Sequence, residues 1–473
     1  MKKTFAIFAL CLLVLLGGVI AVVTHLHSDR NNIVVTAHDR TGDRSAAEGF
    51  TAQQSVRRGG HLLWDLTIDL GTPEDSTARF TYVREDMGGL VEAAPEDLIF
   101  YLTTDSYGSA SAIETEAAEM DDPWTRMIQD VYNRTPEGEI RTENLLLSDY
   151  FTYYPLIVHF ILPENADGIK GTQNSNLLHQ ALQDFFRFPV VPDDTLPVTM
   201  DRTAEDGCTM EHRPGTASPS MQSVCAITQE GCFFSFYPTT RPFPSFGEVP
   251  GGYGLYWIAM ADGQPDPDSL SCIYPLPEGT YALDLTLTPD SSRLVMTTGS
   301  AEGYGCIVLD TQTMKEIQTF PVPMDPPMCS TAFLTTQDGT RIPYLCCSFE
   351  VMPSLAGEDF FCLMTKEEIH LFLLKDGQYA HQFSVPSQEE NLQTYRPGGT
   401  GLWTGETLAL AKGTDDKPGL ELWVYDHQGT LLYHGKYVTS LEQDARTDPE
   451  DMEYWKNSLY LVEGAELTLG WEG

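Results

Sequence analysis

The side chains that could carry out chemistry are scattered along this chain of 473 residues. None of its 11 histidines has another at i+3 or i+4, the spacing at which one helix face presents two metal ligands. The local motifs of serine hydrolases, zinc proteases, phosphate-binding loops, dinucleotide-binding folds and EF-hands are absent. The sequence therefore indicates no catalytic, cofactor-binding or metal-binding residue, and we expect no cofactor. Enzymatic activity stays open, with a non-enzyme favoured, because a triad assembled from distant loops leaves no local motif.

Four pairs of aspartates come nearest to a metal site. They are Asp121 with Asp122, Asp193 with Asp194, Asp266 with Asp268, and Asp415 with Asp416. All lie in or beside turns that contain proline or glycine, where an aspartate accepts hydrogen bonds from nearby backbone N–H groups. Calcium needs several such oxygens converging on one point, and no segment alternates them in that way. We therefore expect these aspartates to stabilise turns.

The cysteines favour buried thiols over disulfides or zinc ligands. Of the 10 cysteines, nine lie between Cys208 and Cys362, without a C-x-x-C pair or an accompanying histidine spacing. Most stand inside apolar runs, where a free thiol behaves as a small hydrophobe. Cys225 and Cys232 are the exception, because a hairpin that turns at Thr228 and Gln229 places them opposite one another. A different turn register would separate them.

The local composition most typical of a binding surface is "SDYFTYYPLIVHFILPE", with Tyr150, Tyr153, Tyr154 and His159. The alternative is that these aromatic side chains belong to the core. Amphipathic helices are predicted on either side, at 122–133 and 176–186, because apolar residues recur there at helical spacing. Residues from about 107 to 188 are therefore predicted to form a helix-containing insertion in a chain of strands.

Short strands dominate the remaining sequence, and several segments can be superposed. Each is an apolar strand, an acidic turn and a second strand. The turn aspartates are Asp262, Asp310, Asp376 and Asp426, at intervals of 48, 66 and 50 residues. These intervals approach the period of roughly 40 to 50 residues that is typical of propeller blades.

One complete blade is predicted between Tyr281 and Pro323. Its strands are expected at 281–287, 293–298, 306–310 and 315–322. The pieces "TPDSSRLVMTT" and "IVLDTQTMKEI" resemble the "SPDG-strand" and "V-x-D-T-x-T-G-strand" of YVTN and WD-repeat-like bacterial propellers, with Ser291, Ser292 and Met314 standing where glycine is common. The resemblance implies a mainly β fold, a β-propeller of about 6–7 blades, some irregular, over residues 53–473.

Further blades are expected from the strands at 61–101 and 188–212. The C-terminal "SLYLVEGAELTLGW" leaves a blade that needs completion, and in such rings the N-terminal strand often completes the last blade. The alternative is two domains, with an α+β unit to about Arg213 and a separate incomplete propeller.

The N-terminus predicts export and membrane attachment. Residues 4–23 are uncharged and long enough, at roughly 20 residues, to span a bilayer as a single transmembrane helix, and Lys2 and Lys3 precede them. We expect an uncleaved signal anchor with residues 1–3 in the cytoplasm, a linker at 24–52 and the rest of the chain extracytoplasmic. A cleaved secretory signal is the alternative.

The formal net charge of −40 excludes nucleic acid as a partner, because phosphates bind lysine and arginine. It equally disfavours tight binding to anionic lipid beyond the anchor. The leading hypothesis is a membrane-anchored extracytoplasmic binding or scaffolding module for an unknown protein or small-molecule ligand. The alternatives are an extracytoplasmic propeller hydrolase or lyase, and a sensor ectodomain that works with a partner membrane protein.

Overall fold

The computed structural model describes most of the strands of the chain. The described residues are 17–18, 30–58, 62–82, 99–103, 123–154, 157–161, 178, 180–190, 192–193, 195–203, 209–212, 221–228, 230–238, 248–261, 264–300, 303–323, 333–335, 341–343, 352–357, 359–364, 368–386, 399–414, 418–441, 459–461 and 467–472. The expected cytoplasmic end at 1–3 and, apart from two glycines, the expected transmembrane segment at 4–23 lie outside them. The described part contains no helix that is both long and apolar enough to span a membrane.

The blade predicted between Tyr281 and Pro323 is present. Its four antiparallel strands lie side by side in chain order: β15 (Tyr281–Leu287), β16 (Arg293–Ser300), β17 (Gly303–Asp310) and β18 (Lys315–Pro321). Successive residues of β16 from Leu294 to Gly299 are all buried, although their side chains alternate between the two faces. Both faces of this sheet are therefore covered, which requires a neighbouring layer on each side.

Two residues that stand where glycine is common in such blades adopt the left-handed conformation that glycine favours. Ser291 has φ 55° and Met314 has φ 56°. Each lies in a turn, Ser291 between β15 and β16 and Met314 between β17 and β18. The sequence departs from the blade pattern here, but the backbone keeps the conformation that the pattern requires.

The same four-stranded unit recurs along the chain. The next two sheets are β21 (Met352–Ala356), β22 (Phe360–Met364), β23 (Glu368–Lys375) and β24 (Gln378–Pro386), then β25 (Gly399–Trp403), β26 (Thr407–Gly413), β27 (Gly419–Asp426) and β28 (Leu431–Thr439). An earlier sheet contains β10 (Met221–Ile227), β11 (Gly231–Pro238), β12 (Gly254–Ala261), β13 (Gln264–Pro265) and β14 (Ser271–Pro275). Short hairpin strands β19 (Phe333–Thr335) and β20 (Arg341–Pro343) lie between β18 and β21 in the chain.

The two ends of the chain complete each other's sheets. Strand β1 (Val35–Gly42) pairs with β28, about 400 residues away in sequence. In return, β29 (Leu459–Leu461) and β30 (Thr468–Trp471) pair with β2 (Phe50–Arg58), which continues into β3 (Leu62–Asp69) and β4 (Thr77–Tyr82). The expected completion of one blade by the other end of the chain is therefore found, and it is reciprocal.

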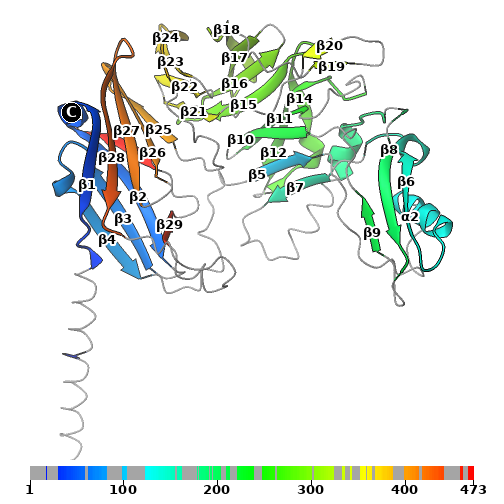
Figure 1. Cartoon of the computed structure of the whole chain (residues 1–473). Coiled ribbons are helices and arrows are strands. Elements are labelled where there is room, and N and C mark those ends of the chain that lie inside the picture. Colours follow the sequence, from blue (N-terminus) through cyan, green and yellow to red (C-terminus); the bar gives the residue numbers. More distant parts are fainter. Residues whose placement is uncertain are drawn as a thin grey trace, which may run out of the picture.

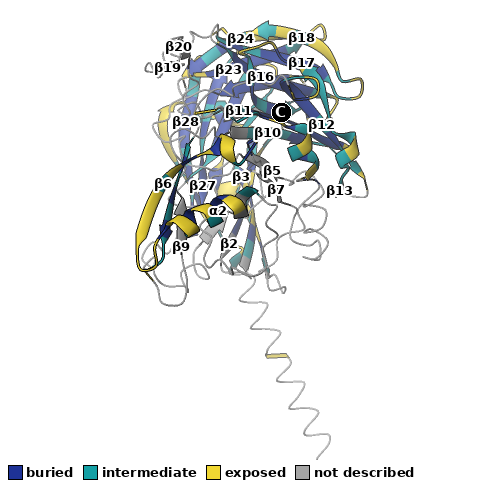
Figure 2. Cartoon of the chain, turned by 90° about the vertical axis from the view of Figure 1, so that its right-hand side faces the viewer, coloured by how far each residue is buried: buried dark blue, intermediate teal, exposed yellow. Residues whose placement is uncertain are grey.

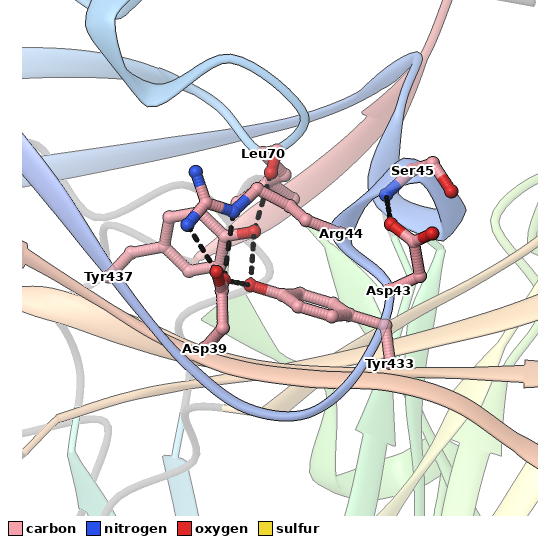
Figure 3. A network of polar contacts seen from close by, with 7 residues as sticks. All are labelled: Asp39, Asp43, Arg44, Ser45, Leu70, Tyr433 and Tyr437. Carbon is pink, nitrogen blue, oxygen red and sulfur yellow. Dashed lines mark hydrogen bonds and ion pairs between the residues drawn. The ribbon is translucent and has the colours of Figure 1, made fainter.

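A polar network fastens this junction (Figure 3). Arg44, in the 3-10 helix Arg44–Ala47 after β1, donates from Nε and Nη2 to the carboxylate of Asp39 at 2.8 and 2.5 Å. Tyr433 of β28 donates to the same carboxylate at 2.7 Å, and the hydroxyl of Tyr437 donates to the carbonyl oxygen of Leu70 at 2.5 Å. Hydrogen bonds from Arg44 and Tyr433 lower the pKa of Asp39. The network joins β1, β28 and the end of β3.

The sheets stack face to face in the order in which they occur, which gives a mainly β molecule with a propeller-like arrangement (Figure 1). The first strands of successive sheets contact one another, from β10 to β15, β21, β25 and finally β30. A shared hydrophobic core fills each interface, for example around Val308 and Phe372, and around Leu66 and Leu422. Strand β5 (Ile99–Thr103), paired with β7 (Ile157–Ile161), contacts β10 on the other side. The described residues form an arc of sheets.

A separate unit, called the cap from here on, packs beside the sheet of β10 to β14. It contains α2 (Pro123–Arg134) and a three-stranded sheet of β6 (Ile140–Leu146), β8 (Thr195–Asp201) and β9 (Thr209–His212). The ring of Phe186, the last residue of the predicted second helix, meets Phe236 at 5.2 Å and Tyr256 at 4.8 Å between centroids. The cap therefore shares one continuous core with the blade.

Two expectations about organisation need correction. The interval 24–52, expected to be a linker, contains β1, a 3-10 helix and the start of β2. The strands at 188–212, expected to supply a blade, instead pair with β6 inside the cap, so this unit reaches past residue 188. In both cases the strand partner lies far away in the sequence, where no local pattern indicates it.

Candidate functional site

In a propeller enzyme, we would expect the acidic and basic side chains of the active site on the inner strand of each sheet. Among the described residues of β5, β10, β15, β21, β25, β29 and β30, Asp284 is the single carboxylate and no histidine occurs. The hydroxyl of Thr286 donates to Asp284 at 3.1 Å. A general acid and base need two titratable groups close to one substrate. The described inner strands therefore assemble no such pair.

Two histidines that are 11 residues apart in sequence meet through a serine. The hydroxyl of Ser384 on β24 lies 2.7 Å from Nδ1 of His370 on β23 and 3.1 Å from Nε2 of His381. Nε2 of His370 is buried without a hydrogen bond, 3.6 Å from the carboxylate of Glu368. A bulge in the pairing of β23 with β24 brings the three polar side chains to one face, which is why sequence spacing did not reveal the cluster.

This cluster resembles a catalytic relay in composition but not in the basicity of its buried histidine. His370 is 0% exposed, and burial, with a smaller effect of His381, lowers its pKa to about 4. The neighbouring Phe372 belongs to the core between the sheets of β15 to β18 and β21 to β24. A general base works best with a pKa near the operating pH, so the buried His370 is a weak base for Ser384 at neutral pH. Ser384 is half-buried and His381 is exposed, so the cluster reaches from the buried ring of His370 to the surface. We therefore interpret it as a polar network that supports the fold.

The other expected roles of histidine, aspartate and cysteine can be compared with the structure. His434 is buried and stacks on Trp423 with centroids 4.9 Å apart, while His427 is exposed in a turn. Asp266, one of the paired aspartates, accepts a hydrogen bond from the backbone N–H of Asp268, as expected for a turn. Within the described ranges, no group of three or more His, Cys, Asp or Glu side chains is arranged to hold a metal ion.

The cysteines of the described strands are thiols, with no disulfide among them. Cys232, Cys306 and Cys362 are buried and Cys225 and Cys272 half-buried, as expected for thiols in apolar strands. The hairpin register pairs Ile227 with Cys232, so Cys225 faces Phe234. Cys225 and Cys232 are thus diagonal neighbours, not opposite partners. Their thiols still interact, because a hydrogen bond with Cys225 and burial raise the pKa of Cys232.

The aromatic segment singled out in the sequence divides between core and surface. Tyr154 is buried, whereas Tyr150 and Tyr153 are half-buried at the surface. The hydroxyl of Tyr150 donates to Asp130 of α2 at 2.8 Å. His159 lies on β7, and its side chain is outside the described set. Two of the four expected binding residues therefore remain available at the surface.

Tyr153 lies in a small charged group where the cap meets the blade. Its hydroxyl donates to Glu248 at 2.7 Å, and the guanidinium of Arg187 lies 5.9 Å from its ring centroid. The hydrogen bond to Glu248 raises the pKa of Tyr153. Glu248 and Arg187 were not recognised from the sequence, because 95 residues separate Tyr153 from Glu248 and no motif links them.

The outer strand of the cap carries exposed apolar side chains beside a charge network. Ile140 is 61% and Leu146 41% exposed, although both belong to β6. Between them, Glu143 pairs with Arg134 at 3.1 Å and with Arg141 at 2.6 Å. Figure 2 shows β6 and α2 largely exposed, in contrast to the buried strands of the blades. We call Ile140, Leu146, Arg134, Arg141 and Glu143 the cap surface.

The arginines of the cap also fix its helix. Arg134 and Arg141 donate to the carbonyl oxygens of Asp130 and Arg134, and Arg202 donates to that of Thr135 at 2.7 Å. These carbonyls lie in the last turn of α2 and directly after it, where cationic side chains are favoured by the helix dipole. The guanidinium of Arg202 also lies 4.0 Å from the ring centroid of Tyr132. The cap surface is therefore held on a well-fastened helix.

The known proteins that are similar in structure belong to propeller-like and WD-repeat-like groups. A putative 6-phosphogluconolactonase from Bacteroides fragilis is 11% identical, with a TM-score of 0.26, over 83% of this chain and 82% of its own. The β-propeller domain of Swd1 from Myceliophteria thermophila is 10% identical, with a TM-score of 0.22, over 51% of this chain and 80% of its own.

A chain of a mitotic checkpoint complex is 14% identical, with a TM-score of 0.23, over 40% of this chain. The present chain spans 46% of the length of that protein, which is about half. No protein-family model and no curated protein sequence matches the chain. The propeller-like arrangement follows from the strand order and the contacts between sheets, independently of these likenesses.

Proposed function

We propose that the protein is an extracytoplasmic binding module, attached to the membrane by residues 4–23, which takes a protein ligand on the cap surface. The exposure of Ile140 and Leu146 beside the paired charges of Arg134, Arg141 and Glu143 carries the proposal. Apolar side chains rimmed by satisfied charges are typical of surfaces that bind proteins. The continuous core beneath the cap supplies the rigidity that such a surface needs.

The proposal includes a ring of about six blades. The sheet of β5 and β7 would form the irregular blade between β2–β4 and β10–β14, and the contact of β5 with β10 supports this position. The cap would then be an insertion of that blade. The reciprocal pairing of the two chain ends is the device by which such a ring avoids an open edge.

A hydrolase or lyase finds no comparable support. Such an enzyme would need convergent acids or histidines on the inner strands, where the described residues supply Asp284 alone. We therefore do not propose a lactonase activity, although one similar structure is named a putative 6-phosphogluconolactonase. A sensor ectodomain would be a special case of the binding module, in which the protein ligand is a membrane protein.

The test is photocrosslinking of the full-length protein in the cells that produce it. A photoreactive phenylalanine analogue replaces Ile140, and in a matched control it replaces Ile317, an exposed isoleucine on β18 outside the cap. We expect a discrete crosslinked product from position 140 and none of the same mass from position 317. Identical products from positions 140 and 317 would contradict a ligand site on the cap. The absence of any product both from position 140 and from position 146, where the analogue replaces Leu146, would contradict it as well.

A further inference from the structure

The residues that follow the proposed anchor are docked on the propeller-like domain. The indole Nε1 of Trp64 on β3 donates to the carbonyl oxygen of Arg30 at 3.0 Å. The side-chain Oδ1 of Asn31 accepts from the backbone N–H of Phe80 at 2.7 Å, and so uses a donor of the last strand of that sheet. The guanidinium of Arg30 lies 4.8 Å from the ring centroid of Phe80. We call Arg30 to Val34 the clamp.

The second half of the clamp is bound to the opposite end of the chain. The backbone N–H of Val34 donates to the hydroxyl of Ser440 at 3.0 Å, and the N–H of Ser440 donates to the carbonyl of Val34 at 2.8 Å. Val35 then begins the pairing of β1 with Thr439 of β28. From Arg30 onward, therefore, the chain is fixed to two sheets at once.

Little chain is left between the clamp and the bilayer. If residues 4–23 span the membrane, only residues 24–29 separate it from Arg30. Six residues reach at most about 20 Å when fully extended. On so short a segment, a domain that is fastened from Arg30 onward would have little freedom to turn against the membrane.

The clamp also defines which end of the domain faces the bilayer. It contacts the end of β4, and it leads into the start of β1 opposite the end of β28. The turn between β27 and β28, with Gln428, lies at the other end of the same sheet, because β28 runs from Leu431 to Thr439. Figure 1 places the cap toward the same end of the molecule as the start of β1.

We infer that the clamp holds the domain in one orientation, with the cap facing the membrane, so that the cap surface meets ligands at the bilayer. This inference rests on the proposed anchor. It adds to the proposed function that the ligand is membrane-proximal, and that the orientation is built into residues 30–34.

The test measures the height of two positions above the bilayer in the same sheet. Full-length protein is reconstituted into phosphatidylcholine vesicles that carry an energy acceptor on the headgroup, with a donor dye at Thr36 or at Gln428, both exposed. The eight or so residues of β28 between these levels span about 25 Å, so we expect transfer from Thr36 to exceed that from Gln428 roughly twofold or more. Equal transfer, or more from Gln428, would overturn the inference.

A pair of variants isolates the clamp. Asn31→Ala removes the acceptor for the Phe80 N–H and leaves the contacts of Arg30 and Val34, so we expect the ratio of the two transfers to fall below that of the wild type without reaching one. Asn32→Ala, at the next and exposed residue, should leave the ratio unchanged. An Asn31→Ala ratio equal to that of the wild type would show that the clamp does not set the orientation.

Failure of the anchor gives a different result. Protein that does not float with the vesicles has no membrane-spanning segment, and the inference then falls together with that part of the proposed function. Protein that floats but shows equal transfer from both positions retains the anchor and loses only the inference.

Discussion

The hydroxyl of Tyr437 donates a hydrogen bond to the carbonyl oxygen of Leu70, 367 residues away in sequence, at a distance of 2.5 Å. Tyr437 is 0% exposed, and burial raises its pKa. It lies on β28, whereas Leu70 directly follows β3. This bond connects the two sheets that contain the chain ends, which are otherwise joined by apolar packing and by the hydrogen bond from Nε2 of Gln54 on β2 to the carbonyl oxygen of Gly419 on β27 at 3.2 Å.

Replacement of Tyr437 by phenylalanine should weaken this junction. The substitution keeps the ring but leaves the carbonyl of Leu70 without its donor, which costs about 1 to 3 kcal/mol of unfolding free energy for a buried group. Urea denaturation measures the difference. Tyr425→Phe on the adjacent strand is the control, because the described part of the chain offers its hydroxyl no hydrogen-bond partner. Equal losses in both variants would show that the bond contributes nothing specific.

Ser291→Gly should stabilise the protein. Ser291 has a positive φ of 55°, a conformation that costs a residue with a Cβ about 1 to 2 kcal/mol and glycine much less. We expect a gain of about 1 kcal/mol after the extra entropy of glycine in the unfolded chain is subtracted. Ser292→Gly is the matched control and should destabilise, because the Ser292 hydroxyl donates to Asp290 at 2.9 Å. Thermal unfolding of both variants is the measurement, and a loss in Ser291→Gly would refute the strain.

The sequence pattern predicted those elements whose partners lie nearby in the chain. The four strands between Tyr281 and Pro321 and the turns between them were predicted, because neighbouring strands in the chain are neighbours in the sheet. Helix α2 was found because Met127 and Val131 lie on one face, and both are fully buried. The aromatic composition of the segment also singled out Tyr150 and Tyr153, the two tyrosines that lie at the surface of the cap.

The missed elements depend on partners distant in sequence. Strand β1 has six exposed residues among eight and no apolar alternation, so its composition resembled a linker, although its backbone pairs with β28. The alternation of β8 correctly indicated a strand but could not indicate that β6, and not a blade, is its partner. The meeting of His370 with His381 depends on a bulge that the sequence does not reveal.

Acid should destabilise the protein beginning near pH 6.5, partly through His370. Burial lowers its folded pKa from 6.5 to about 4, so the unfolded chain binds the proton more readily. The stabilisation from the neutral ring is therefore complete above pH 6.5 and is lost as pH falls toward 4, by at most about 3 kcal/mol. His381 and His434, whose pKa values burial also lowers, act in the same direction.

His370→Gln tests this dependence, because the amide can still bond to Ser384 but does not titrate in this range. We expect a lower stability at pH 7.5 and a shallower decline between pH 6.5 and 4 than in the wild type. His427→Gln, at the exposed turn histidine, should keep the wild-type slope. Chemical denaturation at several pH values measures both slopes, and a wild-type slope in His370→Gln would exclude the histidine as the source.

One side chain joins the outer strands β18 and β24 of two neighbouring blades. Its replacement should show how much this contact contributes to the free energy of unfolding. Gln318 of β18 donates from Nε2 to the carbonyl of Tyr379 at 2.7 Å, and its Oε1 accepts from the N–H of Tyr379 at 2.8 Å. In Gln318→Glu, the carboxylate can still accept but faces the carbonyl with a lone pair. We expect a loss of about 1 to 3 kcal/mol at pH 7.

Protonation should restore part of this loss. A protonated carboxyl can donate to the Tyr379 carbonyl, so folding raises the pKa of the glutamate at position 318. The loss of unfolding free energy relative to the wild type should therefore become smaller as the pH falls below this raised pKa. Gln382→Glu on β24 is the control: its Oε1 accepts from the ammonium group of Lys375 at 2.6 Å, so a carboxylate there should change stability by less than about 0.5 kcal/mol. A deficit in Gln318→Glu that is the same at pH 7 and pH 4 would mean that the carbonyl of Tyr379 does not sense the added charge, and that apolar packing around Phe320 and Phe372 alone holds the two blades together.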